Sequence, residues 1–167
     1  CYAEPALVRA VVRHAIDAGF AVLKLHEAGM PAIRAAREEA GPDVELIVDA
    51  GCPWTLTEAI GAADELNAVG LKFLEEPLWP PENFEGLAEL RHSTGIPIAS
   101  GENASTLLEF ERMLAAGAVD FVQPSPAKMG GVSALRKVFP LAAAHNTPVM
   151  THSFYDGPGL LAALHAT

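Results

Sequence analysis

The sequence predicts an α/β fold in which buried parallel strands alternate with covering helices, and three observations support this prediction. Short apolar segments rich in Val, Ile, Leu and Phe lack polar alternation, which is typical of strands buried on both faces of a parallel sheet. Amphipathic segments with apolar residues at helical spacing separate them. A polar residue also ends each apolar segment at intervals of 23, 26, 27, 23 and 27 residues, which indicates a repeated strand–helix unit. In chain order these polar residues are His26, Asp49, Glu75, Glu102, Ser125 and His152.

The elements can be assigned in chain order from these patterns. The chain begins inside a helical pattern that ends at Ala18-Gly19, and glycine is favoured just after a helix. Gly41, Gly70, Gly95 and Gly117 end later helical patterns in the same way. The expected strands are Phe20–Leu25, Val44–Val48, Leu71–Leu74, Ile96–Ala99, Val119–Val122 and Pro148–Met150. The expected helices between them include Ala32–Ala40, Thr57–Ala68, Phe84–Arg91, Leu107–Ala115 and Ala134–Ala144, and the chain ends inside another helical pattern.

A (β/α) barrel of the TIM type is the favoured form of this fold, because its repeated unit has this size and its reactive groups lie at the carboxyl ends of the strands. A doubly wound open sheet is the alternative. It would normally carry a glycine-rich phosphate turn after its first strand, and this sequence has none. A full barrel needs eight strands and about 250 residues. We therefore expect residues 1–167 to form one incomplete catalytic barrel domain of a larger protein.

The composition excludes several classes of protein. The chain has 21 acidic and 11 basic residues, a net charge of −10 and 50% apolar residues. The acidic surplus argues against a nucleic-acid partner, and the apolar content argues against disorder. The longest run without Asp, Glu, Lys or Arg, Val138–Tyr155, contains two prolines, so we expect no membrane partner. Cys1 and Cys52 cannot build a disulfide framework, which fits the cytoplasmic location that we expect.

Three acidic residues, Asp49, Glu75 and Glu102, end three consecutive expected strands. In a parallel barrel their side chains would meet at one rim, where like charges are costly unless a cation neutralises them. Oxygen ligands favour Mg²⁺, Mn²⁺ or Ca²⁺ over Zn²⁺. Solvated acids at the starts of loops are the alternative, but three acids in register favour a metal site.

A set of short motifs carries a resemblance to a known family. The chain resembles the mandelate racemase/muconate lactonizing enzyme family of the enolase superfamily. This resemblance implies a modified (β/α)7β barrel to which the chain would contribute strands 2–7, with an N-terminal capping domain and the last barrel strand outside the segment. The motifs are Lys24-Leu25-His26, Val48-Asp49-Ala50, Leu74-Glu75-Glu76-Pro77, Gly101-Glu102-Asn103, Lys128-Met129-Gly130-Gly131 and Thr151-His152-Ser153.

The resemblance also implies a cofactor and a reaction. One Mg²⁺ ion per site would be bound by Asp49, Glu75 and Glu102. The ion would stabilise the enediolate that forms when the proton alpha to a substrate carboxylate is removed. The expected partner is a small carboxylate, a sugar acid or a hydroxy acid, and homo-oligomers are common among such barrels. Residues expected to bind substrate or to support the site are Glu76, Asn103, Ser125 and Lys128.

Two histidines are candidate bases. His26 takes the second position of the Lys-x-Lys motif of the family, and Lys24 takes the first, where an orienting charge is expected. His152 matches the histidine at the end of strand seven. Ser125 stands where the family places an aspartate that pairs with this histidine, and serine can orient an imidazole but cannot stabilise an imidazolium as a carboxylate does. A supporting role is the alternative for both histidines.

The expected activity is that of an enolase-superfamily lyase or isomerase. An acid-sugar dehydratase is favoured, because dehydration needs one base and one acid, and His26 and His152 form an asymmetric pair. A racemase or epimerase of a hydroxy acid is the second possibility, and a metal- or ligand-binding barrel disabled by Ser125 is the third. The segment Phe154-Tyr155-Asp156-Gly157 follows His152 and is a candidate wall of the substrate pocket.

Overall fold

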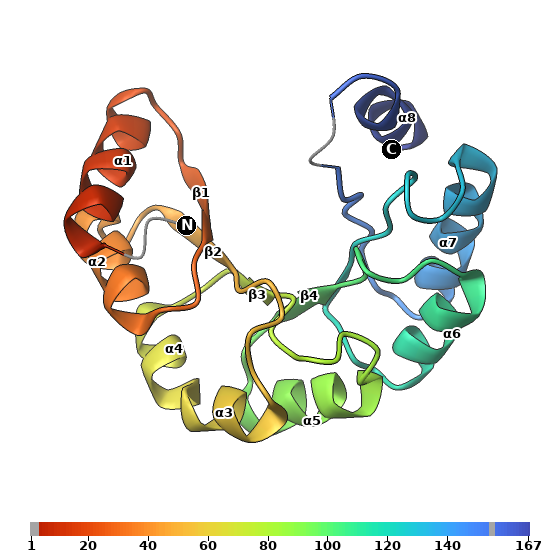
Figure 1. The fold of residues 1–167 in the computed structure, drawn as a ribbon, viewed down its shortest axis with the longest axis horizontal. Coiled ribbons are helices and arrows are strands. Elements are labelled where there is room, and N and C mark those ends of the chain that lie inside the picture. The colour runs from red at the N-terminus through yellow and green to blue at the C-terminus, as the bar shows by residue number, and fades with distance from the viewer. Residues whose placement is uncertain (1–3, 154–155) are drawn as a thin grey trace.

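The computed structural model describes residues 4–153 and 156–167. Cys1 and the Phe154-Tyr155 pair of the candidate pocket wall lie outside these residues. The chain forms one curved, fully parallel sheet of five strands in the order β1-β2-β3-β4-β5. Figure 1 shows the strands inside an open arc whose outer layer consists of helices. The predicted α/β class, an arc of a (β/α) barrel, is therefore confirmed.

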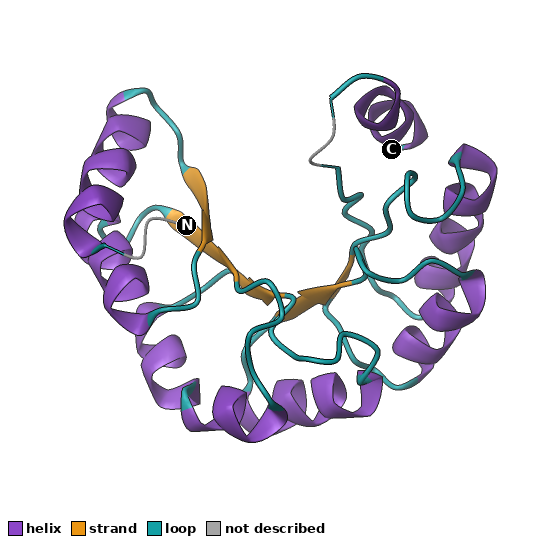
Figure 2. Cartoon of the chain, in the orientation of Figure 1, coloured by secondary structure: helices purple, strands orange, loops and turns teal. Residues whose placement is uncertain are grey.

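Each strand alternates with one or two helices along the chain, as Figure 2 shows. The strands are β1 (Val22–His26), β2 (Glu45–Asp49), β3 (Phe73–Glu75), β4 (Ile98–Ser100) and β5 (Phe121–Val122). The helices are α1 (Pro5–Asp17), α2 (Met30–Ala40), α3 (Leu56–Gly61), α4 (Ala63–Val69), α5 (Phe84–Thr94), α6 (Leu107–Ala115), α7 (Val132–Ala144) and α8 (Pro158–Ala166). Within the described part of the chain, none of these helices is both long enough and apolar enough to cross a membrane.

The sixth expected strand, Pro148–Met150, is reduced to an isolated parallel bridge between Val122 and Val149. Val122 N donates to Pro148 O, and Met150 N donates to Val122 O. Pro148 cannot donate a further hydrogen bond to β5, because proline has no N–H group, and the pairing of the two segments stops there. The prediction of a full sixth strand was therefore wrong, although the segment lies beside β5 as expected.

The expected helix Thr57–Ala68 is divided into α3 and α4. The break lies at Ala62, whose dihedral angles (φ −89°, ψ −3°) leave the regular helix. Gly61 precedes the break, and glycine lowers helix stability in an interior position. Thr55 begins α3 with a capping box in which its side chain and that of Glu58 each accept the other's backbone N–H.

Two apolar layers hold the sheet in place. The outer layer lies between the strands and the helices, and its fully buried members include Leu46, Leu74 and Ile98. The inner layer lies on the concave face and consists of Ile47, Phe73, Ala99 and the partly buried Phe121. The rings of Phe73 and Phe121 lie 5.0 Å apart between centroids. This inner layer forms an apolar floor below the polar ends of the strands.

Candidate functional site

The carboxyl ends of β1, β2 and β3 bring polar side chains together at one edge of the sheet. His26 pairs in register with Asp49, and Asp49 with Glu75. Because the strands are parallel and neighbouring, these residues lie side by side on one rim.

Gly101 carries the chain from β4 to Glu102. Its φ of +131° is one that residues with a Cβ rarely adopt. A Cβ at this position would also lie 3.0 Å from Gln123 N and 3.1 Å from the Phe110 ring. Only glycine fits here, and this fit brings Glu102 to the same rim.

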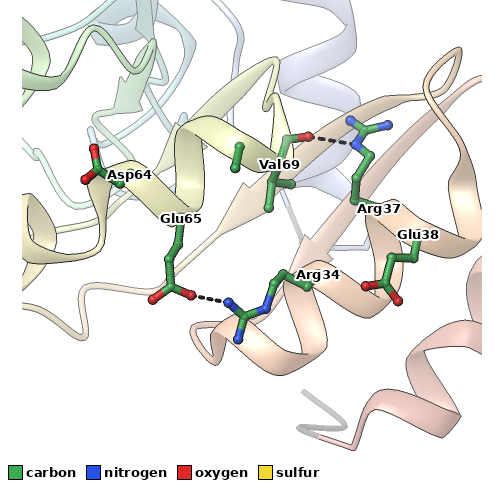
Figure 3. A pocket seen from close by; sticks show the side chains of 7 residues that line it. Arg34, Arg37, Glu38, Asp64, Glu65 and Val69 are labelled. Atoms are coloured by element: carbon green, nitrogen blue, oxygen red, sulfur yellow. Dashed lines mark hydrogen bonds and ion pairs between the residues drawn. The ribbon is translucent and has the colours of Figure 1, made fainter.

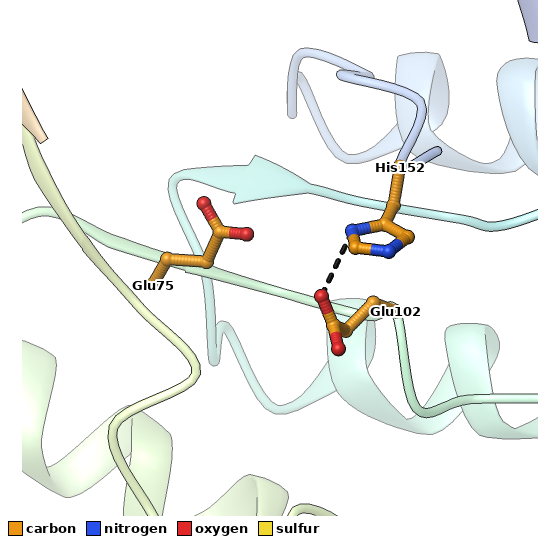
Figure 4. A group of neighbouring side chains, drawn as sticks. All are labelled: Glu75, Glu102 and His152. Atoms are coloured by element: carbon orange, nitrogen blue, oxygen red, sulfur yellow. Dashed lines mark ion pairs between the residues drawn. The ribbon is translucent and has the colours of Figure 1, made fainter. Parts of the chain in front are cut away.

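Glu75, Glu102 and His152 form a compact group, shown in Figure 4. Each offers one possible ligand atom, and these atoms all lie within 4.8 Å of one another. Glu75 is fully buried, while Glu102 and His152 are partly buried. The arrangement brings together two members of the expected triad and the candidate base His152.

Asp49, the third expected ligand, is not a member of that group and is linked to Glu75 through Lys24. Lys24 Nζ lies 2.6 Å from Glu75 Oε1 and 3.0 Å from Asp49 Oδ2. Partial burial lowers the pKa of Lys24, but its hydrogen bonds and ion pairs with the two carboxylates outweigh this effect and raise the pKa overall. The ammonium group therefore neutralises the negative charge between Asp49 and Glu75.

His152 is oriented by Glu102. The His152 Nδ1 atom lies 2.8 Å from Glu102 Oε2, and His152 N donates to Pro124 O. The hydrogen bond from His152 is the main cause of a lowered pKa at Glu102. A carboxylate only accepts hydrogen bonds, so Nδ1 carries the proton, and in the neutral ring Nε2 then carries the lone pair.

His26 lies on the other side of the carboxylates and is far more accessible. Its side chain is 61% exposed, and Nε2 lies 3.9 Å from Asp49 Oδ1. His26 and His152 thus stand at opposite ends of the row formed by Asp49, Glu75 and Glu102.

Glu76 lies behind the rim rather than on it. Its φ of +44° is unusual for a residue with a side chain, and its carboxylate is buried. Oε1 accepts hydrogen bonds from Ser100 Oγ at 2.9 Å and from Gly101 N at 2.8 Å. Burial raises the pKa of Glu76. The side chain holds the end of β4 just before Glu102, and its supporting role in the site stays a prediction.

Asn103 and Lys128 lie beside Glu102. Lys128 Nζ donates to Asn103 Oδ1 at 3.1 Å and lies 3.8 Å from Glu102 Oε1. The amide of Asn103 reaches Cys52 Sγ at 3.8 Å. Burial is the main cause of a strongly raised pKa at the Cys52 thiol, which therefore stays protonated and a poor nucleophile.

Ser125 is fully buried, and its Oγ makes no hydrogen bond within the described residues. Ser125 therefore does not orient the ring of His152, although a serine hydroxyl could do so from this position. The carboxylate that holds this imidazole belongs instead to Glu102.

Ser100 and Trp79 are site residues that the sequence analysis did not identify. Ser100 has no motif of its own, and its hydrogen bond to Glu76 joins two strands that are distant in sequence. Trp79 lies in the loop after β3 and lines a cavity of about 400 Å³ next to Glu102. The sequence did contain an indication that Trp79 lies near the site, because it follows Glu75, a residue at a strand end, by four positions.

A second cavity of about 400 Å³ lies on the outer layer, between α2 and α4 (Figure 3). Four of its five charged residues already have partners, namely Arg34, Arg37, Glu38 and Glu65. Arg34 pairs with Glu65, and Arg37 donates to the carbonyls of Val69 and Gly70 at the end of α4. This cavity is formed by helix packing and lies away from the rim of the sheet.

Several known proteins are similar to this chain. The sequence model of the family described as "Enolase C-terminal domain-like" matches residues 7–167. The chain is 37% identical over 149 residues to D-galactarolactone cycloisomerase of Agrobacterium fabrum, covering 89% of this chain and 38% of that protein. It is 35% identical over 120 residues to L-talarate/galactarate dehydratase of Salmonella typhimurium, covering 72% and 30%.

A solved structure is similar as well. A racemase from Streptomyces coelicolor A3(2), determined with bound magnesium, superimposes with a TM-score of 0.82 at 30% identity. The match covers 96% of this chain and 50% of that one. The chain therefore spans half, or less than half, of the length of these relatives.

Proposed function

We propose that this chain, which belongs to the enolase C-terminal domain-like family, forms the catalytic barrel of a Mg²⁺-dependent enzyme that removes the proton alpha to the carboxylate of a sugar acid. The observation that carries the proposal is the grouping of Glu75, Glu102 and His152 at the rim of the sheet. It joins two oxygen donors suited to Mg²⁺ and an imidazole suited to proton transfer in one place.

The donor set fits a magnesium ion. Asp49, Glu75 and Glu102 would hold it, since carboxylates are preferred by hard cations and these three come from neighbouring strand ends. When bound, Mg²⁺ supplies positive charge next to the substrate carboxylate, where negative charge grows as the proton leaves. Glu76 supports this set because it fixes the backbone just before Glu102.

Lys24 contributes positive charge on the same rim. Its ammonium lies against both Asp49 and Glu75, so it is already held in place when an anionic substrate arrives. We assign Lys24 to charge neutralisation and orientation of the substrate carboxylate, because its ammonium group lies on the same rim, against Asp49 and Glu75.

His26 and His152 would divide the proton transfers between them. They lie at the two ends of the row of carboxylates, so one can face the alpha proton while the other faces the beta oxygen. The partly buried His152 is held at the rim by the contact between its Nδ1 atom and Glu102, and we assign it one of the two proton transfers. The exposed His26 has room to donate a proton to the leaving oxygen or to accept the alpha proton.

Dehydration is the favoured outcome. After the alpha proton leaves, the beta oxygen departs with a proton from the acid, and water is lost when that oxygen belongs to a hydroxyl group. If the oxygen belongs to a ring, the same step opens the ring with no loss of atoms, which is an isomerisation. The 37% identity to a protein named as a cycloisomerase supports this isomerisation as a second candidate reaction beside dehydration.

The test uses the full-length protein with Mg²⁺ in deuterium oxide. Sugar acids and their lactones are screened by proton NMR for exchange at the alpha carbon, and the products by mass spectrometry. We expect Mg²⁺-dependent loss of the alpha proton from at least one sugar acid, with loss of water for a dehydratase and unchanged atom composition for a cycloisomerase. Exchange with inversion at the alpha carbon and no elimination would indicate a racemase or epimerase. The absence of exchange from every compound, with Mg²⁺ bound, would contradict the proposal and favour a ligand-binding barrel.

A further inference from the structure

We propose that the ammonium group of Lys24 is a built-in counter-ion of the candidate magnesium site, which gives up its contact with Asp49, Glu75 or both when Mg²⁺ binds. This inference rests on the proposed function, because it takes Asp49, Glu75 and Glu102 as the ligands of the ion. It adds a regulatory step to that function, since metal binding makes the ammonium group available to the substrate carboxylate.

Lys24 contacts two of the three expected ligands directly. Its Nζ atom lies 2.6 Å from Glu75 Oε1 and 3.0 Å from Asp49 Oδ2. The side chains of Glu75 and Asp49 are only 1% and 10% exposed, so water screens their charges poorly. One cation at hydrogen-bond distance from both carboxylates thus supplies the neutralisation that two buried like charges need.

Asp49 is not gathered with the other two expected ligands. Among the described residues, the one group whose possible ligand atoms all lie within 4.8 Å of one another contains Glu75, Glu102 and His152 but not Asp49. Mg²⁺ holds its oxygen ligands at about 2.1 Å, so the oxygens around one ion lie at most about 4.2 Å apart. The carboxylates must therefore come closer together before all three can bind one ion.

Lys24 stands in the way of that approach. Its ammonium group lies between Asp49 and Glu75, and an ion bound to both carboxylates would add a second positive charge beside it. A lysine carries its compact charge on a flexible four-carbon stem, so the ammonium group can move without a change in the backbone of β1. It then remains on the rim where the substrate carboxylate is expected.

Lys128 provides a comparison within the same site. Its Nζ atom lies 3.8 Å from Glu102 Oε1, and it donates a hydrogen bond to Asn103 Oδ1 at 3.1 Å rather than to a carboxylate. Lys128 therefore adds positive charge near one ligand without joining two of them. Comparing the two lysines separates the displacement of a bound ammonium group from general repulsion between cations.

The test is calorimetric titration of the metal-free, full-length protein with MgCl₂. Lys24→Met removes the competing ammonium group, and its Kd for Mg²⁺ should be at least about tenfold lower than that of the unmodified protein. Lys24→Gln keeps a hydrogen-bond donor without the charge, should bind at least about threefold more tightly, and replaces Lys24→Met if that variant does not fold without metal. Lys128→Met is the matched control and should change Kd less than about twofold.

Urea unfolding of the same variants gives a readout that does not depend on turnover. Without metal, Lys24→Met should unfold at a lower urea concentration than the unmodified protein, because Asp49 and Glu75 lose the cation between them. With saturating Mg²⁺ most of this difference should disappear, because tighter binding to the folded state stabilises the variant more than the unmodified protein.

An Mg²⁺ affinity of Lys24→Met that is unchanged, weaker, or raised no more than that of Lys128→Met would overturn this inference and leave the proposed function intact. A loss of stability of the same size with and without Mg²⁺ would also overturn it, because Lys24 would then keep both contacts beside the ion. An unmodified full-length protein that binds no Mg²⁺ would overturn both proposals. The absence of alpha-proton exchange in a protein that shows these effects of Mg²⁺ would overturn the proposed function alone.

Discussion

His152 and Glu102 are joined by a 2.8 Å contact between Nδ1 and Oε2. This contact connects a candidate base to a candidate metal ligand and fixes the tautomer of the ring, since the carboxylate can only accept. The other ring nitrogen, Nε2, lies on the side of the ring away from Glu102 and is buried. The histidine thus takes its orientation from a candidate metal ligand, while the buried Ser125 makes no hydrogen bond among the described residues.

The first prediction concerns His152→Gln. The amide of glutamine can still donate to Glu102, but it cannot take up a proton, so alpha-proton exchange should fall by at least about 100-fold. Proton NMR in deuterium oxide measures the rate. His14→Gln, an exposed histidine on α1, serves as the control and should be unaffected. Activity near that of the unmodified enzyme in His152→Gln would assign the base to another residue.

The second prediction concerns Glu76. Glu76→Ala removes the acceptor for Ser100 Oγ and Gly101 N, which frees the backbone before Glu102. We expect activity or Mg²⁺ affinity to fall about 10–100-fold, as is typical for residues that hold a ligand in place. Glu76→Gln keeps an oxygen that can accept both hydrogen bonds and should recover most of the loss. Equal effects of both substitutions would show that charge, not positioning, matters at this residue.

The third prediction compares two buried serines. Ser125 Oγ makes no hydrogen bond within the described residues, whereas Ser100 Oγ donates to Glu76. Ser125→Ala should leave the free energy of unfolding unchanged or slightly higher, because an unsatisfied buried hydroxyl is removed. Ser100→Ala should cost about 1–3 kcal/mol, since it leaves a buried carboxylate with one partner fewer. Urea unfolding measures both, and the reverse order of the two losses would contradict the hydrogen bonding described here.

The fourth prediction is a pH dependence away from the site. Arg91 donates to both carboxylate oxygens of Asp120, at 2.9 and 2.7 Å, and Ile98 N donates to Oδ2. Burial raises the pKa of Asp120, but these hydrogen bonds outweigh it and the pKa is lowered overall. A lowered folded-state pKa stabilises the fold above the unfolded value of about 3.9, and this stabilisation is lost as the pH falls through the folded-state pKa.

Asp120→Asn should therefore lower the free energy of unfolding by about 1–3 kcal/mol at pH 7. The difference from the unmodified protein should shrink as the pH is lowered toward 3. Denaturant unfolding over this pH series measures it, with Asp64→Asn on α4 as the control. If the free energy of unfolding of Asp120→Asn stays below that of the unmodified protein by the same amount down to the lowest pH, the ionised form of Asp120 contributes nothing to stability.

The fold was predictable because strand and helix patterns repeat along the chain and their polar ends recur in register. Asp49 and Glu75 end their strands as expected, since each follows an apolar segment that is buried on both faces. Pro148 shows where local patterns fail, because the pairing of its segment depends on a donor that proline lacks.

The details of the site depend on contacts that residue types alone do not specify. Lys24 was expected to be an orienting charge, but its position between Asp49 and Glu75 depends on the course of a long flexible side chain. The hydrogen bonds of Glu76 require an unusual backbone conformation that no motif indicates. Trp79 was missed because its exposure and its neighbours follow from the path of the loop after β3.

The most direct test of the central claim is calorimetric titration of the full-length protein with Mg²⁺. Asp49→Asn, Glu75→Gln and Glu102→Gln should each weaken Mg²⁺ binding by more than about 100-fold, beyond the loss typical of residues that only support a ligand. The control Glu89→Gln, an exposed acid on α5, should bind as the unmodified protein does, and His152→Gln should retain binding. Undiminished Mg²⁺ affinity in Glu75→Gln or Glu102→Gln, or loss of binding in His152→Gln but not in Asp49→Asn, would contradict the ligand set on which the proposed chemistry depends.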